Sequence, residues 1–212
     1  MILQRMVGKD VAIGLLSLFL LFAGLQSAQA LASEPMEQVK ESVDAILTIV
    51  RDNQPKEEGG KLSDVFRQQI IDIVYDRFDF RAMSRLALAR SWKDISAKEQ
   101  DHFVFLFAKL LENTYYDRIR SYSGEEVVFK EQRKKDDKAI VSSVVVRNSV
   151  ETPVIYKLRN VKGKWLVYDV VIEGVSLVRN YRTQFASIIE KEKYNGLVVR
   201  LEEKIAKKDL SE

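Results

Sequence analysis

Few side chains in this sequence could carry out acid–base or covalent chemistry. His102 is the single histidine of the 212 residues, and the chain has no cysteine, which excludes thiolate nucleophiles and zinc–cysteine sites. His102 stands beside Phe103 in the first turns of a helical pattern. It could serve there as a general base or simply lie on the helix surface. No second histidine completes a metal site, so we expect no metal centre.

Two carboxylates have a spacing that could make an acid–base pair. Asp169 and Glu173 are four residues apart in a stretch typical of a strand, and alternate residues of a strand lie on the same face. Outward-facing or capping groups at the end of a strand are the other interpretation. The chain has neither a Gly-x-Ser-x-Gly nucleophile motif nor a glycine-rich phosphate loop. We therefore expect a protein that is not an enzyme and has no cofactor.

The segments that position these groups begin with four predicted helices. Apolar residues recur at helical spacing from Met36 to Val50, from Leu62 to Val74 and from Asp79 to Ala89. The fourth helix is the best marked, because Ser96 and Glu99 form a capping-box pattern before a long apolar run. A helix with so much apolar surface should be covered on more than one side.

After Gly124 the apolar period changes from about 3.6 to about 2 residues, which is typical of strands. Short connections predict a meander of antiparallel neighbours. A helix then runs to about Lys191, Asn195-Gly196 interrupts it, and a last helix follows. The order predicts an α+β domain whose helices pack on one face of a curled four-stranded antiparallel sheet. The predicted strands are Val127–Gln132, Ala139–Asn148, Val154–Asn160 and Trp165–Ile172.

Apolar side chains on these elements are arranged to face one interior. Alternation places Tyr156 and Leu158 on one sheet face, and it predicts a shared face for Leu166, Tyr168, Val170 and Ile172. The helices opposite contribute aromatic and aliphatic residues. The interior is either an ordinary solid core or a hollow one that holds an apolar ligand.

The N-terminal thirty residues have the order of a secretory signal peptide. Arg5 and Lys9 precede the apolar run Val11 to Leu25, and small residues follow. An uncleaved anchor is the alternative, but the run is shorter than the ~20 residues that span a bilayer. We expect residues 1–30 to be removed, with cleavage after Ala30 or Ala32. Residues 31–212 would then form a single exported domain without disulfides, which fits the bacterial periplasm.

Charge is abundant but almost balanced, with 34 Lys+Arg against 31 Asp+Glu and a formal net charge of +3. The basic run at 133–135 is followed at once by two aspartates, and we interpret it as an exposed hairpin tip. No concentrated basic stripe is present, so nucleic acid is not an expected partner.

Several blocks of the sequence together resemble the MlaC family, also called toluene-tolerance proteins. The resemblance covers essentially all of the expected mature chain, but Ala89 stands where that family has a glycine. The blocks are Ile172-Glu173-Gly174-Val175-Ser176-Leu177; Asn180-Tyr181-Arg182 with Gln184-Phe185; Trp92 ahead of Ser96 to Gln100, then Phe103, Phe107 and Tyr115; and Gly196 with Leu201.

The resemblance implies a periplasmic phospholipid-binding shuttle with a cone-shaped fold like that of nuclear transport factor two. Its partners would be an outer-membrane lipid-transfer complex and an inner-membrane ABC transporter that contains an MCE-domain protein. Some relatives are associated with hopanoids, so another lipid is an alternative cargo. An isomerase- or hydratase-like enzyme on the same cone, and an adaptor with a solid core, are the other hypotheses.

A lipid carrier of this kind needs an apolar pocket with its charged groups outside. Gly174 would allow the chain to turn sharply, and Ser176 would cap the next helix. Lys157, Arg179 and Arg182 are the expected cations at the rim, where a charged headgroup stays in water. The expected pocket residues are Phe80, Met83, Phe103, Phe107, Val144, Val146, Tyr156, Leu158, Val170, Ile172, Leu177, Tyr181 and Phe185.

Overall fold

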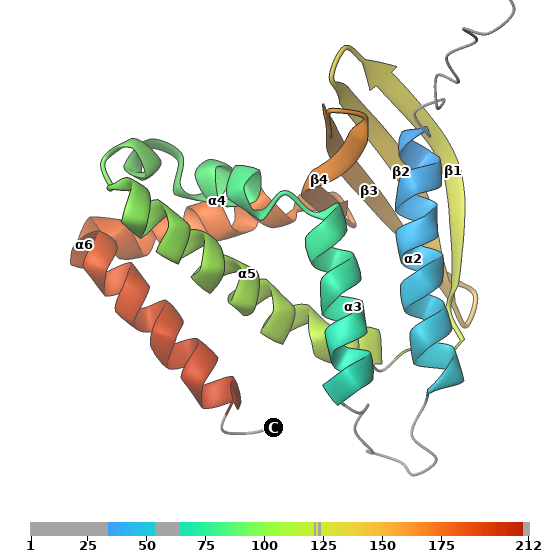
Figure 1. Cartoon of the computed structure of the whole chain (residues 1–212), viewed down its shortest axis with the longest axis horizontal. Coiled ribbons are helices and arrows are strands. Elements are labelled where there is room, and N and C mark those ends of the chain that lie inside the picture. The colour runs from blue at the N-terminus through green and yellow to red at the C-terminus, as the bar shows by residue number, and fades with distance from the viewer. Residues whose placement is uncertain (1–33, 54–63, 121, 123, 210–212) are drawn as a thin grey trace, which may run out of the picture. The chain divides into compact units, whose positions relative to one another are not determined.

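The computed structural model describes residues 34–53, 64–120, 122 and 124–209 (Figure 1). The predicted signal peptide and the first residues of the predicted second helix lie outside this part of the chain. The elements are α2 (Pro35–Asp52), α3 (Asp64–Arg77), α4 (Phe80–Leu88), the 3-10 helix η1 (Ala89–Lys93), α5 (Ala97–Arg120), β1 (Glu126–Lys135), β2 (Lys138–Arg147), β3 (Val150–Val161), β4 (Lys164–Ile172), β5 (Val175–Ser176) and α6 (Leu177–Asp209).

The sheet is an antiparallel meander with strand order β1-β2-β3-β4-β5. The predicted α+β class is therefore confirmed, but the sheet has five strands instead of four. The additional strand, β5, has only two residues, too few to show an alternating pattern. It forms because Glu173 and Gly174, with φ values of 50° and 81°, turn the chain back onto the end of β4.

Helix α2 covers the inner face of the sheet at β1 and β2 (Figure 1). Arg77 at the end of α3 holds this layer in place. Its guanidinium donates hydrogen bonds to the Gln38 Oε1 atom at 2.7 Å, the Ser42 hydroxyl at 2.9 Å and the Trp165 carbonyl at 3.0 Å. Burial lowers the pKa of Arg77. One buried side chain thus joins α2, α3 and β4.

The apolar interior is divided into separate groups of buried side chains. The helical cluster lies among α4, η1, α5 and α6, and the sheet cluster lies between α2 and the inner sheet face. A third, small cluster surrounds Val50 and Ile70. Phe78 packs against both the helical cluster and the sheet cluster. The buried members of the helical cluster include Phe80, Met83, Phe103, Phe107, Tyr181, Phe185, Leu197 and Leu201; those of the sheet cluster include Val39, Val141, Leu158, Trp165, Val167 and Val170.

Helix α6 consists of two arms that meet at Lys193, where φ is 63° and ψ is −179°. The break therefore comes two residues before the predicted Asn195-Gly196 interruption. The chain reverses its direction at this point (Figure 1). Gly196 is needed because a Cβ atom there would lie 2.3 Å from the Glu192 Cβ atom. The Tyr194 hydroxyl donates to the Glu99 carbonyl at 3.0 Å, which fixes the C-terminal arm against α5.

Among the described residues, no helix combines the length and apolar character needed to cross a membrane.

Candidate functional site

The junction between β4 and α6 is built around the buried carboxylate of Asp169. It accepts hydrogen bonds from the Ser176 hydroxyl at 2.8 and 3.0 Å and from the Val178 amide at 3.1 Å. Lys157 donates to it at 2.9 Å. The Ser176 oxygen in turn accepts from the Arg179 amide at 3.1 Å. Asp169 is therefore a capping group for α6, placed where a helix N-terminus favours a negative charge.

This network decides between the two interpretations of the carboxylate pair. Asp169 already has donors on its carboxylate, whereas Glu173 is exposed on the turn before β5. Lys157, expected at a rim, instead neutralises a buried carboxylate. The capping interpretation is the correct one, and these residues provide the turn from strand to helix.

His102 lies on the surface between α5 and the C-terminal arm of α6. Its Nε2 atom is 3.4 Å from a Glu202 carboxylate oxygen, and the two side chains are 45% and 49% exposed. Within the described part of the chain, no three or more histidine, aspartate or glutamate side chains come together as a metal site.

The pocket residues predicted on helices do come together, but they pack tightly. The Phe107 ring centroid lies 5.2 Å from that of Tyr181 and 5.4 Å from that of Phe185, with both pairs edge to face. The Phe103 ring stacks on that of Phe107 with centroids 5.9 Å apart and meets that of Phe185 edge to face at 5.7 Å. Edge-to-face contacts of this kind stabilise a solid core. These rings therefore form one wall of an interior and do not themselves enclose an empty space.

The pocket residues predicted on strands divide between the two faces of the sheet. Tyr156 pairs with both Val141 and Val170, so these residues share the inner face. Val144 and Val146 pair instead with Pro153 and Glu151. Because neighbouring residues alternate, this register places both valines on the outer face, opposite Tyr156. The expectation that they line a cavity together with Tyr156 and Leu158 was wrong.

A bulge in β4 corrects a second assignment. Leu158 pairs with Val167 and Lys157 with Asp169, which leaves Tyr168 as the extra residue. An extra residue reverses the alternation beyond it. Leu166 therefore faces away from Val170 and Ile172, contrary to the predicted shared face.

The helices that carry the helical cluster meet the sheet mainly along β4. The Asp79 amide donates to the Val167 carbonyl of β4 at 2.8 Å, and Arg159 of β3 forms an ion pair with the Asp79 carboxylate. The hydrogen bond from the Val178 amide to Asp169 joins α6 to β4. Asp79 also accepts from the Ala82 amide at 2.8 Å, which caps α4. The inner faces of β1 and β2 are reached chiefly by α2.

Apolar side chains at the margin of each cluster are only half-buried, and Phe78 packs against both clusters. Phe129 and Tyr156 stack on the inner sheet face with ring centroids 6.4 Å apart. Burial raises the pKa of Tyr156 and of Tyr115 on α5, as expected for phenols in apolar surroundings. Half-buried apolar groups at these margins are suited to contact an apolar ligand. They are Val43, Phe129, Val145, Tyr156 and Ile172 beside the sheet cluster, and Val74, Phe78, Tyr115 and Leu177 beside the helical cluster.

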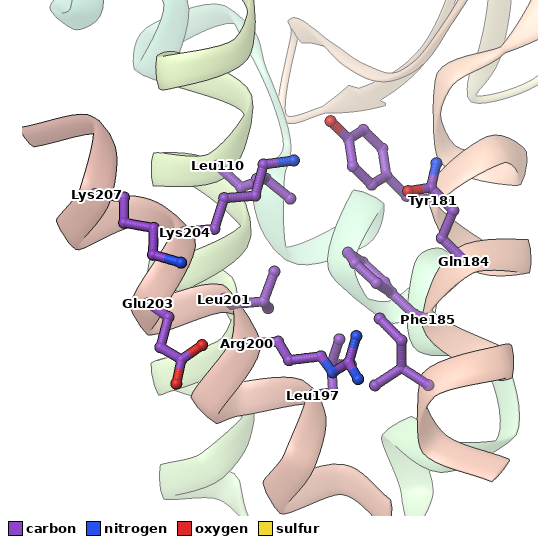
Figure 2. A pocket seen from close by; sticks show the side chains of 11 residues that line it. Leu110, Tyr181, Gln184, Phe185, Leu197, Arg200, Leu201, Glu203, Lys204 and Lys207 are labelled. Atoms are coloured by element: carbon purple, nitrogen blue, oxygen red, sulfur yellow. The ribbon is translucent and has the colours of Figure 1, made fainter. Parts of the chain in front are cut away.

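A separate cavity of about 360 Å³ lies between α5 and the two arms of α6 (Figure 2). Tyr181 and Phe185, two predicted pocket residues, form part of its wall. Arg179 and Arg182, predicted at the rim, lie instead along an open groove on the outer side of the first arm. The other lining residues are Leu110, Gln184, Ile188, Leu197, Arg200, Leu201, Glu203, Lys204 and Lys207.

Sequence reasoning did not find the cations of this cavity. Arg200, Lys204 and Lys207 have the spacing of one helix face. That spacing alone does not say which other element the face meets. Only the reversal at Lys193, where a non-glycine residue has positive φ, folds this face back over the first arm.

Comparison with known proteins places this architecture in a family. The sequence model described as "MlaC protein" matches residues 40–203. The chain belongs to the MlaC family. The resemblance seen in its residue blocks is thus confirmed.

Two curated relatives of this MlaC-family protein extend the match. It is 22% identical over 194 residues to the "intermembrane phospholipid transport system binding protein MlaC" of Haemophilus influenzae, covering 87% of this chain and 89% of the relative. It is also 22% identical over 177 residues to the toluene tolerance protein ttg2D of Pseudomonas putida, covering 82% and 81%.

A solved structure shows the same fold with a ligand bound. The phospholipid-binding protein from Ralstonia solanacearum, in complex with a phospholipid, superposes with a TM-score of 0.74 and 28% identity. The match covers 84% of this chain and 99% of the other. The MlaC-family fold therefore extends over most of the chain.

Proposed function

We propose that this protein binds a phospholipid and carries it between membrane complexes, with the acyl chains at the boundary between the sheet cluster and the helical cluster. The observation that carries the proposal is the division of the interior. Buried side chains form separate clusters, half-buried apolar groups pack against each of them, and Phe78 packs against both. The phospholipid complex of the similar Ralstonia protein and the transport name of the Haemophilus relative support the choice of ligand.

The energetics suit a carrier. Transfer of a CH₂ group from water to an apolar site gains ~0.8 kcal/mol, so two chains of about sixteen carbons gain on the order of 20 kcal/mol. Escape of the lipid into water is therefore negligible. A bilayer offers nearly the same gain, so exchange between a membrane complex and the protein is close to balanced.

The partners and the compartment follow from this proposal. A lipid that crossed open water would lose its burial energy, so loading and unloading require direct contact with membrane complexes. An outer-membrane lipid-transfer complex and an inner-membrane ABC transporter with an MCE-domain protein are the partners that we propose. Export to the periplasm through the segment 1–30, cleaved after Ala30 or Ala32, places the protein between them. A hopanoid is the alternative cargo.

A carrier also accounts better than an enzyme for the two candidate catalytic groups. Asp169 is committed to capping α6, and His102 lies on the surface near Glu202. A general acid or base must instead reach the reacting group inside the pocket.

Two neighbouring valines of β2 allow a sharp test of the ligand position. Val145 packs with the sheet cluster and Val144 lies on the outer face, yet both are half-buried. Val145→Trp should fill the boundary and remove most of the phospholipid that co-purifies with the protein. Val144→Trp should retain it. Lipid extraction and thin-layer chromatography measure both, with circular dichroism as the folding control.

Equal lipid contents in the two folded variants would contradict the proposed position of the acyl chains. Failure of the wild-type protein to move labelled phospholipid between donor and acceptor vesicles in the presence of its membrane partners would contradict the transport function.

A further inference from the structure

The cavity between α5 and α6 is separate from the boundary to which the phospholipid was assigned. All its lining residues come from these two helices, and none comes from the sheet (Figure 2). Its volume of about 360 Å³ lies near the lower end of the range for ligand pockets, ~300–1,000 Å³. A methylene group fills about as much space as a water molecule, ~30 Å³. The cavity therefore has room for roughly a dozen chain carbons, which means one chain and not two.

The wall of this cavity is apolar on three sides. Leu110 of α5, Phe185 of the first arm and Leu197 and Leu201 of the C-terminal arm are all buried. Burial also raises the pKa of Tyr181, which keeps its phenol neutral. The apolar part of this lining favours a hydrocarbon chain, and its polar part favours a polar or charged group.

The opening carries positive charge. Arg200 is held by two hydrogen bonds to the Glu192 carboxylate, one of them 2.7 Å long. Lys204 and Lys207 are one and two turns further along the same arm, and within the described residues neither forms an ion pair. Lys204 extends from the C-terminal arm toward the first arm (Figure 2). Glu203 is the remaining acid at the opening, so the two lysines leave an excess of positive charge there.

We propose that this cavity is a second binding site, which takes an anionic amphiphile with a single chain. A chain of about twelve carbons lies among Leu110, Phe185 and Leu201, and its carboxylate or phosphate headgroup meets Lys204 and Lys207. A fatty acid and a lysophospholipid share this chemistry. The site does not depend on the phospholipid that is bound at the cluster boundary.

Calorimetric titration of the purified protein with three twelve-carbon probes tests the proposal. Sodium laurate carries a carboxylate, lauroyl lysophosphatidic acid carries a phosphate, and dodecyl maltoside is uncharged. We expect one molecule of either anionic probe per protein, and weaker binding of the maltoside. The tighter anionic probe identifies the source of the headgroup. Raising the salt concentration should weaken the anionic probes alone, because exposed charges are screened.

Substitutions separate the headgroup from the chain. Lys204→Gln with Lys207→Gln should weaken laurate about fivefold to tenfold, as expected for two exposed charge contacts, and leave the maltoside unchanged. Lys162→Gln with Lys191→Gln, which removes two exposed charges elsewhere, should have no effect. Ile188→Trp should fill the cavity and abolish binding of all three probes, while the co-purified phospholipid remains.

Several results would overturn the proposal. Equal laurate affinity in the Lys204/Lys207 variant and its control would exclude the headgroup contact. Unchanged binding to the folded Ile188→Trp variant would exclude the cavity. Displacement of the bound phospholipid by laurate, one molecule for one, would mean that the probe enters the phospholipid site. A lipid-free wild-type protein that still binds laurate would leave this site standing and contradict only the phospholipid proposal.

Discussion

Ala89 has a backbone conformation that residues with a Cβ atom rarely adopt. Its φ is 51° and its ψ is −113°, at the point where α4 ends and the chain enters η1. Its amide still donates to the Arg85 carbonyl, which closes the last turn of α4. Glycine is favoured at such a position because it lacks the Cβ clash. This agrees with the glycine that the family resemblance leads us to expect at position 89.

Ala89→Gly should therefore stabilise the protein by about 1 kcal/mol in spite of the greater freedom of glycine in the unfolded chain. The matched control is Ala186→Gly on the exposed side of the first arm of α6, which should cost about 1 kcal/mol. Urea denaturation of both variants measures the difference. Destabilisation by both would show that position 89 is not strained.

Tyr194 links stability to alkaline pH. Burial, followed by the Glu99 charge, raises its pKa from 10.0 to about 12. A raised native pKa means that the folded state holds the phenol proton more tightly, so this contribution is complete below pH 10 and is lost between pH 10 and about 12. Tyr115, Tyr156 and Tyr181 also have raised pKa values and act in the same direction.

Tyr194→Phe should lower stability at neutral pH, because the hydrogen bond to the Glu99 carbonyl is lost. It should also make stability fall less steeply between pH 10 and 12. Melting temperatures measured across that interval test both effects. An alkaline slope identical to that of the wild type would mean that Tyr194 titrates alike in the folded and unfolded states.

At the scale of helices and strands, regular patterns were predicted well and their interruptions were not. The Ser96–Glu99 capping box forms as expected, with the Ser96 amide 2.7 Å from a Glu99 carboxylate oxygen. Periodicity also located the helices and the four longer strands. The β4 bulge at Tyr168 and the turn at Lys193 depend on one residue each, so they leave no trace in an averaged period.

The limits of residue spacing decided which parts of the candidate site were predicted. The helical aromatic residues were found because a helix face is fixed by spacing alone. Val144 and Val146 were misplaced because spacing says which residues share a face, but not which face of the sheet points inward. Lys204 and Lys207 were missed because their position at the cavity opening depends on how the two arms of α6 meet.

The turn of α6 gives a test at this scale. Lys193→Gly should stabilise the fold by about 1 kcal/mol, since the region around φ 63° and ψ −179° is normally occupied by glycine. Gly196→Ala should destabilise it by more than 1 kcal/mol, because the new Cβ atom would meet the Glu192 Cβ atom at 2.3 Å. Asn195→Ala, at an exposed helical position beside both, is the control. If Gly196→Ala behaved like this control in urea denaturation, the arms would not approach so closely.

For the described domain as a whole, the central feature is that the buried side chains form separate clusters and not one continuous core. The helical cluster and the sheet cluster are joined chiefly at Phe78 and along β4. Natural cores are normally close-packed, and empty apolar space is costly. A bound lipid would supply the missing contacts and stabilise the folded state by mass action.

Native mass spectrometry of the protein purified from membrane-containing cells tests this view most directly. We predict a species heavier than the polypeptide by the mass of one phospholipid, which collisional activation releases as a lipid ion. Repeated preparations that contain only the bare polypeptide mass would contradict the carrier function and the proposed binding of acyl chains between the two clusters.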